Sequence, residues 1–219
     1  MGTIETIING KVATLLFFHP SSNSFPSTLL QQLTKEINAL GNNKSISVIV
    51  LKSSGTGAFC AGASFDELLS VSNFEEGSQF FSGFANVINA MRKCPKLIIG
   101  RIHGKAVGGG VGLAAACDYS FACTKSEIKL SEIAIGIGPF VIEPAVSRKI
   151  GKTAMSEMTL NPTAWKSSKW AFEKGLYSEL FETIEELDLR LEEYSKELSS
   201  YNEEALFEMK KVLWEGTDH

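Results

Sequence analysis

Cysteine and histidine are scarce in this chain, and neither residue type is arranged to hold a metal ion. The four cysteines form no C-x-x-C pair, and the three histidines are scattered along the sequence. A zinc site needs such ligands clustered at short, regular spacings. The residues are Cys60, Cys94, Cys117, Cys123, His19, His103 and His219. The sequence therefore predicts no metal site and four buried structural thiols.

An excess of basic charge is also missing. The 219 residues contain 21 Lys and Arg against 25 Asp and Glu, which gives a net charge of −4. Nucleic-acid binders usually carry a broad basic footprint, so we expect no nucleic-acid partner. A small anionic ligand is compatible with this charge, because turned backbone N–H groups can hold one.

No apolar run is long enough to cross a membrane, which takes about 20 residues. The longest apolar stretches are interrupted by Arg101, His103, Lys105 and Asp118. The N-terminal segment has Glu5 and lacks the apolar centre of a signal peptide. We therefore expect a cytoplasmic protein with no membrane partner.

What the chain does contain is a globular composition, with 44% hydrophobic and 21% charged residues. Asn9-Gly10 separates two β-branched, apolar stretches, which predicts a hairpin with a type I′ turn. Apolar residues over 29–40 recur at helical spacing. Asn73 begins another predicted helix, which ends before Pro95. Further strands are expected at 47–52, 97–102, 119–123 and 127–130, and a short helix of small residues at 111–117.

Strands separated by helices of these lengths indicate an α/β fold with crossover connections. From about Thr153 the sequence becomes more charged and helical, and Thr183 with Glu186 predicts a capping box. We expect an α/β core over residues 1–150 and a helical C-terminal region over residues 151–219. No stretch rich in proline or glycine separates these regions as independent domains.

Two segments of small residues could hold a ligand with their main chain. The first, Ala58–Glu67, follows a predicted strand, and small residues let a ligand approach the backbone closely. The second, Ile102–Leu113, contains three consecutive glycines at the start of a predicted helix, where unpaired N–H groups favour an anion. It does not match the dinucleotide-binding fingerprint or a phosphate-binding P-loop. The alternative for both segments is a turn that only packs tightly, and His103 is expected to be a hydrogen-bonded structural residue.

A third segment places one carboxylate, Glu132, at the head of an apolar, glycine-rich run that ends at Pro139. Apolar surroundings disfavour the charged form of an acid, which suits a proton shuttle near neutral pH. Glu143, eleven residues further on, is a candidate for a second acid. The alternative is that Glu132 lies on the surface near a helix start.

In this order and spacing, the three segments resemble the crotonase family, the enoyl-CoA hydratase/isomerase superfamily. The matching stretches are Ala58–Glu67 (AFCAGASFDE), His103–Asp118 (HGKAVGGGVGLAAACD) and Leu130–Pro139 (LSEIAIGIGP). The pattern is nearest to methylglutaconyl-CoA hydratase-like members. The resemblance implies a spiral of ββα units, a helical C-terminal region, and assembly into homotrimers or hexamers. It also implies further helices after Trp214, so we expect the C-terminal region to be shortened.

In that family the substrate is an acyl-CoA thioester, whose oxygen is held by two backbone N–H groups. By motif these groups belong to Ala63 and Gly109, and Glu132 matches an acid/base position of the family. The resemblance implies no separate cofactor, since CoA is part of the substrate. The residues implied to contact CoA are Ala61, Ala63, Ser64, Phe65, Asp66 and Gly109.

Hydratases of this family commonly carry a second glutamate, and Gly112 stands at that position here. Glu143 is then the candidate that could replace it. Three alternatives stay open. The chain is an enoyl-CoA hydratase, which we favour, an enoyl-CoA isomerase with Glu132 as its sole proton shuttle, or a non-catalytic homologue that binds CoA.

Overall fold

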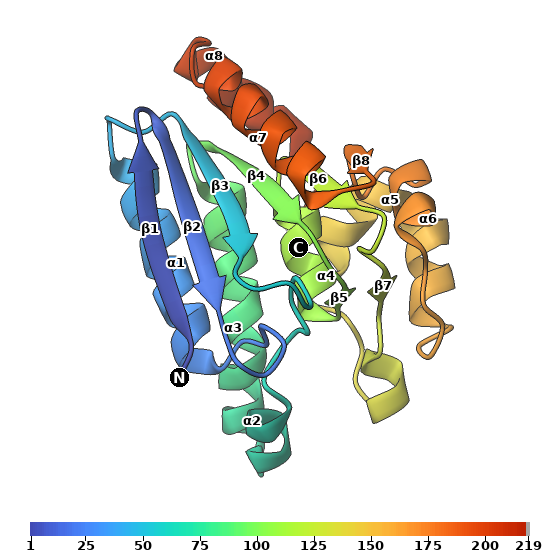
Figure 1. The fold of residues 1–219 in the computed structure, drawn as a ribbon. Coiled ribbons are helices and arrows are strands. Elements are labelled where there is room, and N and C mark those ends of the chain that lie inside the picture. The colour runs from blue at the N-terminus through green and yellow to red at the C-terminus, as the bar shows by residue number, and fades with distance from the viewer. Residues whose placement is uncertain (218–219) are drawn as a thin grey trace.

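A computed structural model describes residues 1–217 and places a six-stranded sheet at the centre of the molecule (Figure 1). The strands lie in the order β1 (Thr3–Asn9), β2 (Val12–Phe18), β3 (Val48–Ser53), β4 (Leu97–Ile102), β6 (Tyr119–Cys123) and β8 (Glu179–Phe181). β1 and β2 are antiparallel, whereas the other neighbouring pairs are parallel. A second, small sheet pairs β5 (Ala106–Val107) with β7 (Ile128–Lys129) in parallel.

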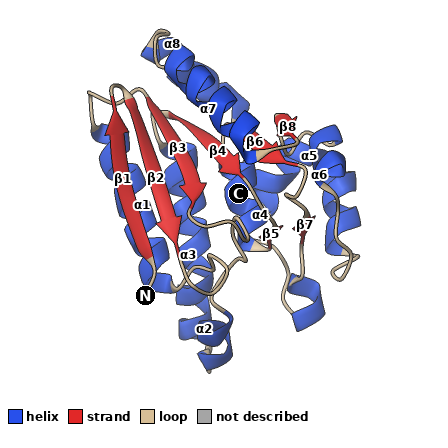
Figure 2. Cartoon of the chain, in the orientation of Figure 1, coloured by secondary structure: helices blue, strands red, loops and turns tan. Residues whose placement is uncertain are grey.

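Helices lie on both faces of the large sheet (Figure 2). One face is covered by α1 (Ser27–Asn42), α3 (Phe74–Lys93), α4 (Gly109–Ala116) and α5 (Glu143–Thr159). The opposite face carries α7 (Ile184–Leu198) and α8 (Glu203–Leu213). The remaining helices are α2 (Phe65–Ser70), α6 (Ser168–Glu173) and the 3₁₀ helix η1 (Glu132–Ile135). The architecture is therefore three layers, with the sheet between two layers of helices.

The sheet is buried on both faces because apolar side chains of its central strands point to both sides. β3 is apolar over most of its length, as is typical of parallel strands covered on both sides. Its Ile49 and Leu51 pack into the main core with α1 and α3. Val48 and Val50 point to the other face and pack with Leu187 of α7.

A repeating unit runs along the chain, made of a strand of the large sheet, a short pairing segment and a helix. β4, β5 and α4 form one such unit, and β6, β7 and α5 form another. After β3, Cys60 pairs with Ala106 of β5 before the chain enters α3. The expected α/β fold with ββα units is confirmed.

The N-terminal hairpin is present, but its turn differs from the predicted type. Asn9 pairs with Val12, so the loop is Gly10-Lys11. Gly10 has a φ of 59°, whereas Lys11 does not have a positive φ. A single positive φ at the first loop residue is the type II′ pattern, because a type I′ turn needs two.

The C-terminal third is less uniformly helical than expected, because β8 joins the large sheet beside β6. The helical region expected from about Thr153 already begins at Glu143, and a break at Gly151 interrupts α5. The capping box of Thr183 and Glu186 at the start of α7 is confirmed. The strand expected at 127–130 shortens to β7, and the helix expected at 111–117 begins two residues earlier.

The cysteines and the hydropathy of the helices were also the subject of predictions. The four cysteines are buried and free, as predicted. Within residues 1–217, none of the helices combines the length and the hydropathy needed to cross a bilayer.

Candidate active site

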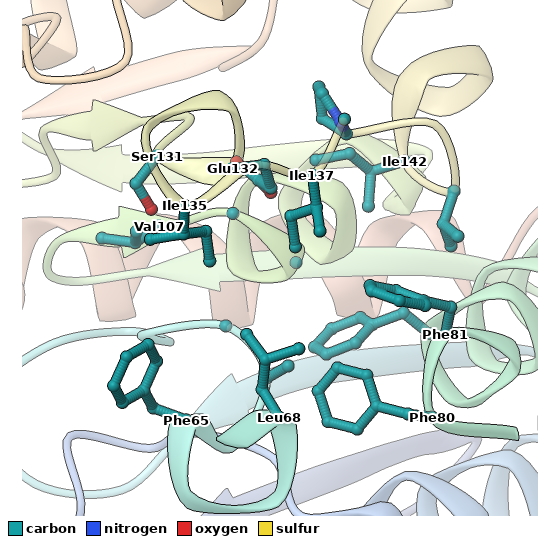
Figure 3. Close-up of a pocket in the computed structure, with 18 of the residues that line it drawn as sticks. Phe65, Leu68, Phe80, Phe81, Val107, Ser131, Glu132, Ile135, Ile137 and Ile142 are labelled. Carbon is teal, nitrogen blue, oxygen red and sulfur yellow. The ribbon is translucent and has the colours of Figure 1, made fainter. Parts of the chain in front are cut away.

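A pocket with apolar walls lies between α2, α3 and the segment around η1 (Figure 3). Its cavity volume is about 180 Å³. The three segments singled out in the sequence all reach it, through Ala63, Gly109 and Glu132. The fold thus brings together backbone and side-chain groups that are far apart in the chain.

The glycine triplet lets the main chain contact its surroundings at distances that side chains would prevent. A Cβ added at Gly108 would lie 2.8 Å from Glu132 Oε1, and one at Gly109 would lie 2.5 Å from the ring of Phe84. A Cβ at Gly110 would meet a backbone carbonyl oxygen at 2.3 Å. Gly108 also has a φ of 53°, which other residues rarely adopt. The triplet therefore holds the start of α4 directly against the carboxylate and the aromatic wall.

Two backbone N–H groups at the pocket have no acceptor within residues 1–217. Gly109 is the first residue of α4, and the first N–H groups of a helix lack intrahelical partners. Ala63 lies between two hydrogen bonds to Phe25, which accepts from the amide of Ser64 at 2.9 Å and donates to the carbonyl of Gly62 at 2.8 Å. A Cβ on Gly62 would be 3.4 Å from the Gly109 nitrogen, so the two segments touch. Two donors placed together can stabilise an oxygen that gains negative charge.

Glu132 is the first residue of η1 and lines the pocket from the side opposite α3 (Figure 3). Its Oε2 is buried and has no hydrogen-bond partner among the described residues. Burial raises the pKa of this carboxyl group above its usual range, although the backbone N–H groups of Glu132 and Ser131 act in the opposite direction. A carboxyl group with a raised pKa can both accept and return a proton near neutral pH.

Gly112 lies one turn into α4, and the space beside it is already filled. A Cβ added at Gly112 would lie 2.4 Å from Ile142 Cγ2 and 3.4 Å from Ile88 Cδ1. Ile142 is 3% exposed and lines the pocket. The space beside Gly112, the position at which the family commonly carries a second glutamate, is therefore filled by an aliphatic side chain from the segment before α5.

Glu143 does not line the pocket, although its neighbour Ile142 does. Glu143 is the first residue of α5, and its carboxylate accepts a hydrogen bond from Ser147 Oγ at 2.6 Å and pairs with Lys152. The structure does not bring this carboxylate to Glu132. The reason is that the side chain of residue 142, rather than that of residue 143, points inward.

Comparisons with known proteins concern the chain as a whole rather than this pocket. A family model described as enoyl-CoA hydratase/isomerase matches residues 7–218. The chain belongs to the enoyl-CoA hydratase/isomerase family. The resemblance carried by the three segments, to the crotonase superfamily, is thereby confirmed.

Curated relatives within this family are similar over different lengths. The human mitochondrial methylglutaconyl-CoA hydratase is 37% identical over 117 residues, which make up 53% of this chain and 34% of that protein. A protein named "Probable enoyl-CoA hydratase" from Bacillus subtilis (strain 168) is 28% identical over 225 residues, covering 99% of this chain and 86% of that protein. The match to the human enzyme therefore spans about a third of its length.

Solved structures of the family have the same fold. An enoyl-CoA hydratase from Mycobacterium smegmatis has a TM-score of 0.91 at 25% identity, covering 99% of this chain and 84% of that chain. One from Bacillus halodurans has a TM-score of 0.89 at 25% identity, covering 96% and 85%. The crotonase-like fold predicted from the motifs is confirmed.

The residues that the family resemblance assigns to CoA contact divide into two groups. Ala61 and Phe65 line the pocket together with Ala63 and Gly109. Ser64 instead caps α2, where its side chain accepts a hydrogen bond from the amide of Glu67 at 3.4 Å. Asp66 is exposed in the first turn of α2. The structure thus brings four of these six residues to the pocket.

His103 lies outside this site. It is 3% exposed, and neither ring nitrogen has a hydrogen-bond partner among the described residues, so the expected hydrogen-bonded role is not observed. Burial lowers the pKa of this imidazole to about 4, and the positive charge of nearby Arg101 contributes to the shift. His103 is consequently neutral near pH 7 and takes no part in the pocket around Glu132.

Sequence reasoning missed the aromatic wall of the site. Phe80, Phe81 and Phe84 of α3 line the pocket, whereas their helical spacing indicates only that they share one face of the helix. The available signal was the number of aromatic residues on one helix face. Spacing cannot reveal that this face borders a cavity, because that depends on how far the η1 segment lies from α3.

Proposed function

We propose that the protein is an enoyl-CoA hydratase, which adds water to an α,β-unsaturated CoA thioester or removes it. The observation that carries this proposal is a partly desolvated carboxylate, Glu132, in the same apolar pocket as the unpaired amides of Ala63 and Gly109. Family membership supports an acyl-CoA substrate.

In the proposed reaction the thioester oxygen accepts hydrogen bonds from the amides of Ala63 and Gly109. Glu132 takes a proton from water while the water oxygen bonds to the β-carbon, and the double-bond electrons move toward the thioester oxygen. The resulting enolate then takes the proton from Glu132 at its α-carbon, which restores the carboxylate. Losing one such backbone donor typically lowers the rate by about 10²–10³-fold, and acid–base catalysis contributes about 10²–10⁴-fold.

An enoyl-CoA isomerase is the second candidate, and the packing of Ile142 beside Gly112 favours it. With that space filled, Glu132 is the sole ionisable side chain among the described residues that line the pocket. One carboxylate is sufficient to move a proton between two carbons of the substrate. The third candidate, a non-catalytic homologue, would bind acyl-CoA without turning it over.

Incubation with a panel of enoyl-CoA thioesters in deuterated water separates these candidates. Hydration yields a β-hydroxyacyl product with deuterium at the α-carbon, which mass spectrometry detects. Isomerisation yields a shifted double bond and no hydroxyl group. If neither product forms while acyl-CoA still binds, the non-catalytic alternative replaces both.

Assembly into homotrimers or hexamers and a cytoplasmic location stay predictions. Light scattering of the purified protein measures the first, and cell fractionation measures the second.

A further inference from the structure

We propose that the acyl-binding site of this protein accepts an uncharged, apolar chain and discriminates against acyl groups that end in a carboxylate. This inference rests on the proposed function, since it places the acyl part of a CoA thioester in the pocket around Glu132. It separates the protein from the relative named methylglutaconyl-CoA hydratase, because a methylglutaconyl group carries a free carboxylate.

The walls of the pocket are the first observation. Phe80 and Phe81 of α3 face Ile137 and Ile142 across the pocket, and Leu68 of α2 lies beside Phe80 (Figure 3). The ring centroids of Phe80 and Phe81 are 5.2 Å apart in an edge-to-face arrangement, which stabilises both rings in this wall. An acyl chain between these two walls would contact carbon atoms on both sides.

The charges of the pocket are the second observation. Among the described residues that line it, Glu132 has the one ionisable side chain, and no lysine, arginine or histidine is present. A terminal carboxylate entering this site would lose its water, find no cation, and share the pocket with another acid. Burying such an unpaired charge is strongly unfavourable.

The lysines nearest in sequence to residues of the pocket make their contacts outside it. Lys105 pairs with Glu127 at 3.0 Å and lies 4.4 Å above the ring of Trp165. Lys129 lies 4.6 Å above the same ring. Both cations are therefore held against Trp165, which does not line the pocket.

The volume of the cavity indicates how much of an acyl chain the pocket can enclose. A cavity of about 150 Å³ with apolar walls holds a benzene ring, and this pocket has about 180 Å³. The site consequently fits a branched or linear chain of about that bulk. Shape therefore does not exclude a short dicarboxylic acyl group, and the absence of a cation has to provide the discrimination.

A matched pair of saturated thioesters isolates the charge. Glutaryl-CoA carries the terminal carboxylate, and its analogue with an isopropyl group in place of that carboxylate has nearly the same shape. We expect calorimetry to give about 100-fold or greater preference for the isopropyl analogue, the scale expected for burying an unpaired charge. Affinities within threefold of each other would overturn the inference.

A pair of variants at Phe81 tests whether the missing cation is the cause. Phe81 is half-buried at the pocket, so an arginine there can extend its guanidinium along the wall. F81R should bind glutaryl-CoA about tenfold more tightly than F81M, which removes the ring without adding charge. Equal binding of glutaryl-CoA by the two variants, both folded by circular dichroism, would contradict the inference.

The two proposals fail in different ways. Selective binding of the isopropyl analogue without turnover of any enoyl-CoA would overturn the proposed hydration and still support the inference. Failure of wild-type protein to bind either thioester would overturn the proposed function, because no acyl-CoA site would remain.

Discussion

Ile142 Cγ2 lies 2.4 Å from the point at which a side chain on Gly112 would begin. The two residues come from different elements, since Gly112 is inside α4 and Ile142 immediately precedes α5. Any residue larger than glycine at position 112 requires Ile142 to move. The space that a second carboxylate on residue 112 would need is therefore occupied by Ile142.

Adding the missing acid should therefore succeed only with a second change. Gly112→Glu alone should lower the free energy of unfolding by about 1–3 kcal/mol, because it overpacks the core. Ile142→Ala alone should cost about 2–5 kcal/mol through the cavity it leaves. The double variant should lose less free energy of unfolding than the sum of the two single losses. Its hydration rate should exceed that of Ile142→Ala. Urea denaturation and a spectrophotometric hydration assay measure both effects, and strict additivity would contradict the packing argument.

Glu132→Gln should abolish most activity without unfolding the protein. Removing the proton acceptor should lower kcat by about 10²–10⁴-fold, while the melting temperature should not fall, since Oε2 has no partner to lose. Glu173→Gln, on the exposed face of α6, serves as a matched control. The loss of rate in Glu143→Ala should be at least tenfold smaller than the loss in Glu132→Gln. The reason is that the Glu143 carboxylate lies outside the pocket, where it accepts a hydrogen bond from Ser147. An equal loss in both variants would reinstate Glu143 as an acid.

The raised pKa of Glu132 predicts how stability changes with pH. Its usual pKa is 4.5, and burial raises the pKa in the folded protein. The folded state then holds the proton more tightly than the unfolded state, so this group's stabilising contribution is present below pH 4.5 and is lost as pH rises through the folded pKa. Glu132→Gln does not lose this contribution, so its melting temperature relative to wild type should increase as pH rises from 4.5 through the folded pKa of Glu132. A constant difference between the two proteins over that range would show that the carboxyl group is not desolvated.

Gly109→Val should lose acyl-CoA binding for two separable reasons. Its Cβ would lie 2.5 Å from the ring of Phe84, and its branched side chain would lie beside the unpaired amide of residue 109. Phe84→Leu in the same protein should recover part of the stability by relieving the contact with the ring. Calorimetry with acetyl-CoA should still find no binding in the double variant. Recovered binding would show that the triplet serves packing alone.

The C-terminal helix depends on a buried ion pair between Lys210 and Asp118. Lys210 Nζ lies 3.0 Å from Asp118 Oδ2, and the two side chains are 1% and 4% exposed. Asp118 also accepts hydrogen bonds from the amide of Ile98 and from Trp214 Nε1. Lys210→Met should lower the free energy of unfolding by about 3–5 kcal/mol, because it leaves a buried carboxylate without its cation. Asp118→Asn should lower the free energy of unfolding less when it is added to Lys210→Met than when it is made in the wild-type protein. Urea denaturation of the wild type, the two single variants and the double variant tests this.

Local sequence predicted the features that neighbouring residues determine by themselves. The presence of the N-terminal hairpin, the caps at Asn73 and Thr183, and the amphipathic helix over 29–40 were identified correctly, because each depends on side chains within one or two turns. The type of the hairpin turn was predicted wrongly, since its loop is Gly10-Lys11 and only Gly10 has a positive φ. The small-residue segments around Ala63 and the glycine triplet also indicated where backbone would be accessible.

Only the tertiary structure decided which side chains meet in the site. Glu143 and Ile142 are neighbours in sequence, and the direction in which α5 starts determines that Ile142 faces Gly112 while Glu143 pairs with Lys152. The same applies to β8, whose three residues are too few to form a recognisable strand pattern and pair because β6 presents an unpaired edge. Contacts between distant segments depend on how all the layers pack together, and a periodic pattern within one segment contains no information about that distance.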